Sequence, residues 1–153
     1  WRFMAVRFDS PACLPLETSS LKPGCIRMRF RRRLTRLEYV RVSLAEVLLK
    51  RDSLEGWFRG FYAKDLKRRS YRVEEHRLKG HDGIQVQGAP WLVFSPLRLV
   101  GRGRLLRAYG WHCEETNRIF ICLYDGPESS VDLLERMRDS MECCESGRRD
   151  AEI

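Results

Sequence analysis

The chain has 153 residues, of which 43% are hydrophobic and 33% are charged, and its formal net charge is +8 at pH 7. This length fits one domain that can bury a sizeable core. The composition excludes a membrane-spanning helix, because no apolar run approaches about 18 residues. No secretory signal pattern is visible either, so we expect a cytoplasmic protein with no membrane partner.

Arginine supplies 24 of the 29 basic residues. Arginine-rich chains include phosphate-binding proteins, but also proteins from hot habitats, whose surfaces carry networks of ion pairs. The charge is unevenly distributed, with a net +14 over residues 1–110 and a net −6 over residues 111–153. An acidic C-terminal helix packed on a basic sheet would neutralise part of this charge, so the composition alone does not assign a nucleic-acid partner.

The first part of the chain predicts strands and one loop. Residues 1–8 alternate as a short strand, and residues 9–24 contain three prolines and predict a loop. Residues 25–31 alternate apolar side chains with arginines and form the strongest strand pattern in the chain. Residues 35–42 return as its antiparallel partner.

Residues 43–69 predict a long amphipathic helix with a candidate break at residues 50–53. Ser43 and Glu46 have the S-x-x-E spacing of a helix capping box. Aromatic side chains recur at steps of three and four residues, which is typical of a face packed in the core. These aromatic residues are Trp57, Phe58, Phe61 and Tyr62.

The second half of the chain predicts two hairpins and a final helix. The hairpins pair residues 71–78 with 83–88 and residues 105–113 with 118–124, and residues 89–104 between them are irregular. The final helix runs from Ser130 to about Cys143 and carries acids in its first turn.

Short, hairpin-like connections predict an α+β fold: an antiparallel sheet of about six to seven strands, with a long central helix and a C-terminal helix packed on it. We expect a single domain over residues 1–145 and a flexible tail over residues 146–153. This order of elements resembles the PsbP-like fold of the extrinsic subunits of photosystem II and their Ran-binding relatives. The resemblance implies the sandwich fold only, because the chain contains no functional motif of that family.

The adjacent His112 and Cys113 are the first candidates for chemistry. Neighbouring residues of a strand point to opposite faces, so a regular strand cannot direct both at one ion. A zinc site built from Cys113, Cys143, Cys144 and a histidine is one alternative, although none of these residues has the usual metal-ligand spacing. Our primary expectation is that the protein holds no metal and no cofactor.

Disulfides are a second use for the cysteines. Cys113 ends a strand, and Cys143 or Cys144 ends a helix that must pack on the same sheet, so one bond could join them and stabilise the fold by about 2–4 kcal/mol. Cys13 and Cys25 flank the proline-rich loop and form a second candidate pair.

An enzyme with a cysteine nucleophile would need a histidine base and an orienting group. The histidines are His76, His81 and His112, and His81 lies in a glycine-containing turn whose neighbours are typical turn residues. The chain has no hydrolase, metalloprotease or phosphate-binding signature. We therefore expect a protein that is not an enzyme.

A basic ribbon is the remaining candidate site. Arg27, Arg29 and Arg31 share one strand face, and Arg32 and Arg33 follow them. Such a ribbon can bind phosphates, but it is also typical of a solvated face held by salt bridges. The sequence thus favours a non-catalytic binding or interaction module with a protein partner. The alternatives are a binder of nucleic acid or another polyanion, and a Cys/His-dependent enzyme or zinc protein.

Overall fold

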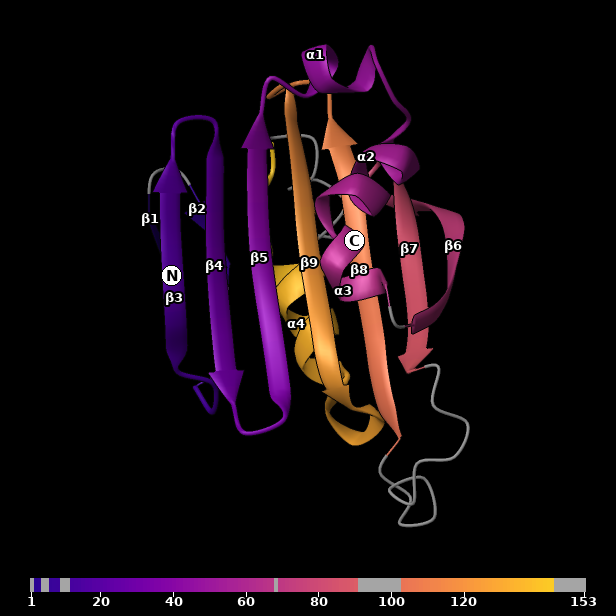
Figure 1. Cartoon of the computed structure of the whole chain (residues 1–153). Coiled ribbons are helices and arrows are strands. Elements are labelled where there is room, and N and C mark those ends of the chain that lie inside the picture. Colours follow the sequence, from indigo (N-terminus) through magenta and orange to yellow (C-terminus); the bar gives the residue numbers. More distant parts are fainter. Residues whose placement is uncertain (1, 4–5, 9–11, 68, 91–102, 145–153) are drawn as a thin grey trace.

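The computed structural model describes residues 2–3, 6–8, 12–67, 69–90 and 103–144. Its centre is a seven-stranded antiparallel sheet with the strand order β3-β4-β5-β9-β8-β7-β6 (Figure 1). A separate two-stranded hairpin pairs β1 (Arg2–Phe3) with β2 (Val6–Arg7). The strands of the main sheet are β3 (Leu16–Lys22), β4 (Cys25–Arg32), β5 (Thr35–Ser43), β6 (Arg69–Leu78), β7 (His81–Pro90), β8 (Arg104–Cys113) and β9 (Arg118–Pro127).

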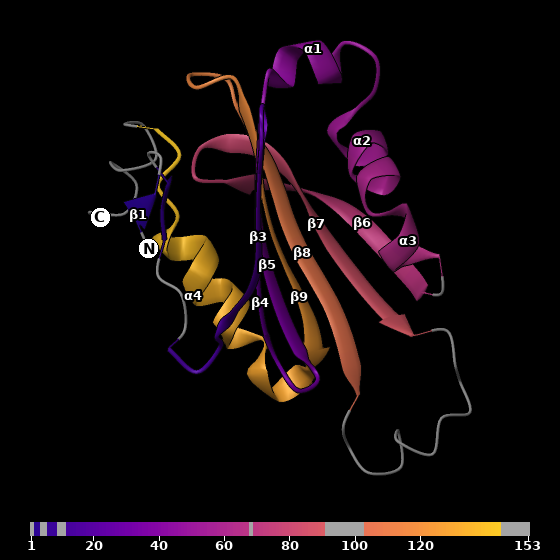
Figure 2. The same ribbon diagram turned by 60° about the vertical axis from the view of Figure 1, so that its left-hand side comes forward.

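The helices lie on opposite faces of this sheet (Figure 2). The first three, α1 (Ala45–Leu49), α2 (Leu54–Phe61) and α3 (Ala63–Leu66), follow one another over one face. The last helix, α4 (Asp132–Ser140), follows a 3₁₀ turn at Glu128–Ser130 and covers the other face. No helix among the described residues has the length and apolar character that crossing a membrane requires.

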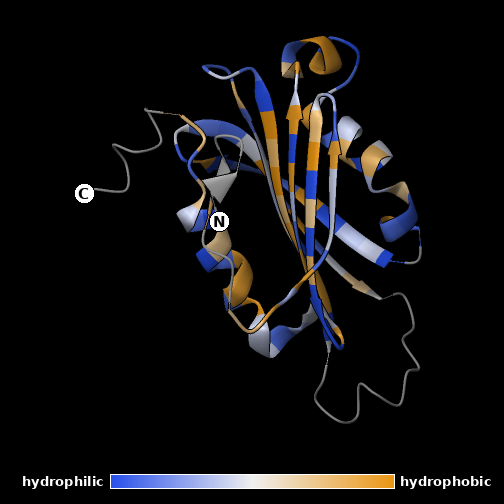
Figure 3. Ribbon diagram, turned by 90° about the vertical axis from the view of Figure 1, so that its left-hand side faces the viewer, coloured by the Kyte–Doolittle hydropathy of each residue, from blue (hydrophilic) through white to orange (hydrophobic). Residues whose placement is uncertain are grey.

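Alternation along the strands creates two cores, one on each face (Figure 3). The core under α4 includes Met28, Phe30 and Trp111, and the core under α2 and α3 includes Phe58 and Tyr62. The apolar alternation predicted for residues 25–31 is therefore confirmed, with its arginines on the face that carries α1, α2 and α3. The two predicted hairpins are also confirmed, as β6–β7 and β8–β9.

The predicted long central helix is wrong, because residues 43–69 form three short helices. Ser43 ends β5, and Leu44 precedes α1 in the left-handed conformation with φ 61° and no side-chain cap. The expected break near residues 50–53 is real: the Ser53 hydroxyl accepts a hydrogen bond from the Gly56 N–H at 3.0 Å and caps α2.

The prediction of a loop over residues 9–24 is wrong for residues 16–22, which form the edge strand β3. This strand is exposed along nearly its whole length, so it lacks the apolar alternation that reveals a half-buried strand. The final helix is shorter than predicted, since Met141 is already extended. The predicted irregular segment at residues 89–104 and the predicted tail at residues 146–153 lie mostly or wholly outside the described residues.

Candidate metal centre

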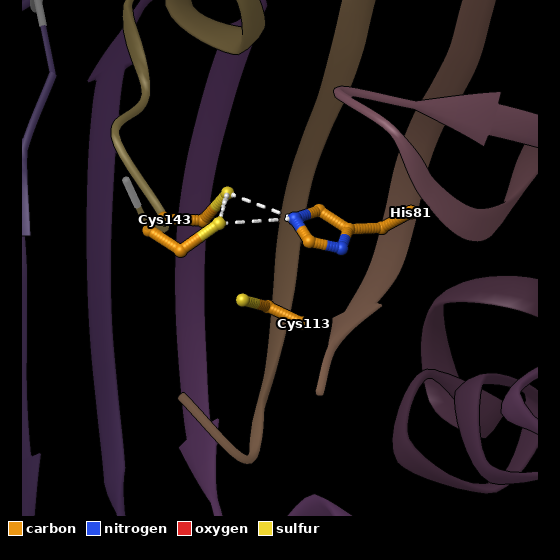
Figure 4. Close-up of side chains that lie close together, drawn as sticks. His81, Cys113 and Cys143 are labelled. Carbon is orange, nitrogen blue, oxygen red and sulfur yellow. Dashed lines mark hydrogen bonds between the residues drawn. The ribbon is translucent and has the colours of Figure 1, made fainter. Parts of the chain in front are cut away.

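Four potential metal ligands from three separate segments converge beside the core under α4. They are His81, Cys113, Cys143 and Cys144, and one ligand atom of each lies within 4.8 Å of the others. The imidazole of His81 points toward the sulfurs of the cysteine pair, and the Cys113 side chain projects into the same space (Figure 4). Cys113 and Cys143 are buried, whereas His81 and Cys144 are half-buried.

Strand register explains why His81 meets Cys113. The hairpin turn before His81 has positive φ at both Lys79 (51°) and Gly80 (78°), so β7 begins at His81 itself. The β7–β8 pairing places Gly83 opposite Trp111. The pairing ends there, and the same antiparallel register continued by two residues leads to His81 and Cys113, on the face covered by α4.

The cysteine pair reaches this site because α4 ends beside the β6–β7 turn. Leu134, Met137 and Met141 are buried against the sheet and fix the position of the helix. The Lys79 ammonium donates to the Asp139 carbonyl oxygen at 2.8 Å, which joins the turn to the last turn of α4. The chain then leaves the helix in an extended conformation and brings the vicinal cysteines over the sheet.

Three of the six distances between the ligand atoms lie near the edges of a zinc tetrahedron, and those to the Cys113 Sγ are within 4.8 Å. Bond lengths of about 2.3 Å to sulfur and about 2.0 Å to nitrogen imply edges of about 3.8 Å between two sulfurs and about 3.5 Å between nitrogen and sulfur. The His81 Nε2 lies 3.2 Å from the Cys144 Sγ and 3.5 Å from the Cys143 Sγ, and the two sulfurs are 3.6 Å apart.

Burial raises the pKa of two of these thiols. Burial, followed by the hydrogen bond and the charge of Cys144, raises the pKa of Cys143 to about 12. Burial also raises the pKa of Cys113, although hydrogen bonds from the hydroxyl and backbone of Thr116 oppose this rise by favouring its thiolate. Three thiolates this close would repel one another, and a bound divalent cation would offset that repulsion and favour the deprotonated form of the thiols.

The predicted separation of His112 from Cys113 is confirmed, because they lie on opposite faces of β8. Cys113 belongs to the core under α4, whereas His112 lines a cleft of about 800 Å³ whose lining also includes Leu54, His81 and Ile84. The His112 Nε2 is buried and has no hydrogen-bond partner among the described residues. The histidine at the cluster is therefore His81, which the sequence interpretation treated as part of a turn.

The two predicted disulfides differ in the structure, because the cysteines of one candidate pair lie close together and those of the other lie far apart. All six cysteines are free thiols, but Cys113 lies within bonding reach of the cysteine pair after a small movement. Cys13 and Cys25 are far apart, because the Pro15 carbonyl oxygen accepts from the Arg31 N–H at the opposite end of β4. The six residues from Cys25 to Arg31 span about 20 Å of strand, and the two residues from Cys13 to Pro15 can shorten this separation by about 7 Å at most. The Cα atoms of Cys13 and Cys25 therefore stay beyond the limit of about 7 Å for a disulfide.

The arginine ribbon lies elsewhere, on the opposite face of the sheet. Arg27 and Arg29 donate from their Nε atoms to the buried Glu38 carboxylate at 2.9 and 3.0 Å. Arg31 pairs with the more exposed Glu17 at 3.4 Å. Arg32 and Arg33 are exposed at the end of the hairpin, where Arg33 has φ 53°. Salt bridges thus hold the first three arginines of the ribbon, as the salt-bridged interpretation expects.

The acidic C-terminal helix neutralises part of the basic sheet. Glu135 of α4 lies 3.5 Å from Arg107 and accepts a hydrogen bond from the Tyr109 hydroxyl at 2.8 Å. On β9, the buried carboxylate of Asp125 pairs with Arg69 at 2.8 Å and Arg104 at 3.0 Å. Much of the arginine content therefore serves ion pairs within the fold.

No protein-family model matches this chain, and no curated protein matches it in sequence.

Proposed function

We propose that this protein binds one zinc ion through His81, Cys113, Cys143 and Cys144, and that the ion has a structural role in a non-catalytic binding or interaction module. The observation that carries the proposal is the convergence of one imidazole nitrogen and three sulfurs, from three segments, within 4.8 Å of one another, with His81, Cys143 and Cys144 near the spacing of a tetrahedral zinc site. The ion would join the β6–β7 turn, the end of β8 and the segment after α4.

A structural role follows from the number of ligands. Catalytic zinc sites keep one position for water or substrate, whereas structural sites use four protein ligands. A Cys144–His81 pair alone would resemble the nucleophile and base of a cysteine enzyme. Here the sulfurs of Cys113 and Cys143 lie beside the same pair and supply a third and a fourth ligand, which a cysteine nucleophile and its base would not need.

Zinc accounts for the cluster better than a disulfide does. A bond from Cys113 to Cys143 or Cys144 uses two sulfurs and gives no reason for the third sulfur or for the His81 nitrogen at 3.2 Å. A zinc ion and a disulfide would both join the end of β8 to the segment after α4. The cysteine pattern alone therefore does not distinguish the two.

The experiment is a zinc measurement by plasma mass spectrometry on protein purified under reducing conditions without chelators. We expect one zinc per chain in the wild type and in Cys122→Ser, whose cysteine is buried in the same core but lies outside the cluster. We expect well below one zinc per chain in His81→Ala and in Cys113→Ser. Zinc-free wild-type protein that remains zinc-free after incubation with the metal, or full zinc content in both cluster variants, would refute the proposal.

A further inference from the structure

Two strands at one edge of the sheet, β3 and β4, extend beyond the helices on the face that carries α1, α2 and α3. Figure 1 shows α2 and α3 over β7 and β8, with β3 and β4 open to one side. We call the basic and hydroxyl side chains of these two strands on this face the open face. Its members are Thr18, Ser20 and Lys22 of β3 and Arg27, Arg29 and Arg31 of β4.

Two of these guanidinium groups are held in place by Glu38 of the neighbouring strand β5. The side chains of Arg27 and Arg29 are 32% and 29% exposed, and both bind the Glu38 carboxylate, which is fully buried. One carboxylate therefore serves two guanidinium groups, which leaves a net positive charge. Because their positions are already fixed, these groups lose little side-chain entropy when they bind a ligand.

Hydroxyl groups lie beside the arginines on the same face. The β3–β4 register places Thr18 opposite Arg29 and Ser20 opposite Arg27. Residues directly opposite in an antiparallel pair point to the same side of the sheet. Guanidinium and hydroxyl groups are the side chains that proteins commonly use to contact phosphate oxygens.

An aromatic ledge borders the open face. Trp57 and Phe61 of α2 are half-buried and stack with their ring centroids 5.0 Å apart. The Arg27 guanidinium lies 5.5 Å from the Phe61 ring centroid, so the ledge and the basic strand are in direct contact. The sequence interpretation placed these aromatic residues wholly in the core, and the structure leaves part of both rings accessible.

We propose that the open face binds the phosphate backbone of a single-stranded nucleic acid and that the Trp57–Phe61 ledge stacks against its bases. A basic groove with adjacent aromatic side chains is the combination that single-strand binders use without reading sequence. An acidic protein segment would satisfy the basic residues but would give the aromatic ledge no bases to stack on. This inference is independent of the zinc site, which lies on the other face of the sheet.

The test is fluorescence anisotropy with a labelled 20-nucleotide deoxythymidine oligomer. The four cations of the open face share the carboxylates of Glu17 and Glu38, which leaves about two net positive charges. At about 0.7 released counterions each, these give a salt slope near −1.4, or about a sevenfold loss of affinity between 50 and 200 mM salt. In Lys22→Glu/Arg31→Glu, which leaves the buried Glu38 pairs intact, we expect a clearly weaker affinity and a slope reduced by at least half. The matched control is Lys50→Glu/Arg51→Glu, which makes the same charge change at exposed positions after α1 and should bind more tightly than the open-face variant.

A second variant tests the aromatic ledge. Trp57→Leu should weaken oligonucleotide binding about fivefold or more, with no change in binding to heparin, which has no bases. Thermal unfolding by circular dichroism would confirm that each variant is folded. The proposal is overturned if the oligomer does not bind at 50 mM salt, or if both charge variants weaken binding equally. Heparin or an acidic peptide binding as tightly as the oligomer, with no effect of Trp57→Leu, would show a general polyanion surface instead.

Discussion

Replacing Glu38 by Gln removes the charge that organises β4 and β5 while keeping the size of the side chain. The Glu38 carboxylate is fully buried and accepts from the Nε atoms of Arg27 and Arg29 and from the Tyr62 hydroxyl at 2.9 Å. A glutamine amide offers one oxygen in place of two and directs N–H groups at donors. We expect the folded state to lose most of these interactions.

The magnitude follows from the exposure of each partner. A buried hydrogen bond to a charged group contributes about 1.5–3 kcal/mol, and the fully buried Tyr62 loses a contribution of this size. Arg27 and Arg29 are about 30% exposed and regain water, so their pairs contribute about 0.5–1 kcal/mol each. We therefore expect Glu38→Gln to lower the free energy of unfolding by about 3 kcal/mol.

Urea denaturation at pH 7, monitored by circular dichroism, measures this change. Glu17→Gln is the matched control, because Glu17 makes the exposed pair with Arg31 on the same face and should cost less than about 0.5 kcal/mol. If both substitutions cost the same, or if Glu38→Gln costs under about 1 kcal/mol, the reasoning about the buried carboxylate is refuted.

Two further predictions concern backbone space and pH. Gly83→Ala should destabilise the protein by more than about 2 kcal/mol, because an added Cβ would lie 2.6 Å from the Gly110 carbonyl oxygen. In Gly60→Ala the added Cβ meets no atom within 4 Å, so this substitution should stabilise α2 by up to about 1 kcal/mol. Urea denaturation measures both changes in stability, and equal effects would contradict the packing around Gly83. Burial, followed by the hydrogen bond to Glu135, raises the pKa of Tyr109 to about 12. Because the folded-state pKa lies above the unfolded value of about 10, Tyr109 should stabilise the fold below pH 10 and lose this effect as the pH rises toward 12. Stability measured across this interval should fall less steeply in Tyr109→Phe, and an unchanged slope would contradict the assignment.

Local sequence patterns predicted those parts of the fold in which one strand face is buried. The alternation of Ile26, Met28 and Phe30 identified β4 and its inward face, because burial repeats every two residues. The same pattern is absent from β3, because an exposed edge strand has no buried face and so needs no alternating apolar residues. The long helix was predicted from spacing alone, whereas Ser53 forms a cap that begins a new helix.

The cluster of His81 with the three cysteines could be predicted only in part, for a topological reason. The cysteine pair and Cys113 were identified together because a helix that packs on a sheet must bring its end near that sheet. His81 was not singled out, because its distance from Cys113 depends on the β7–β8 register. The connection between those strands is long and irregular in sequence, so no turn length determines that register from local residues.

The most direct test of the zinc proposal is X-ray absorption at the zinc edge on the purified protein. We expect a first coordination shell of three sulfurs at about 2.3 Å and one nitrogen at about 2.0–2.1 Å, with the nitrogen signal lost in His81→Ala. A first shell made only of oxygen and nitrogen, or a wild-type protein that binds no zinc, would contradict the proposed centre.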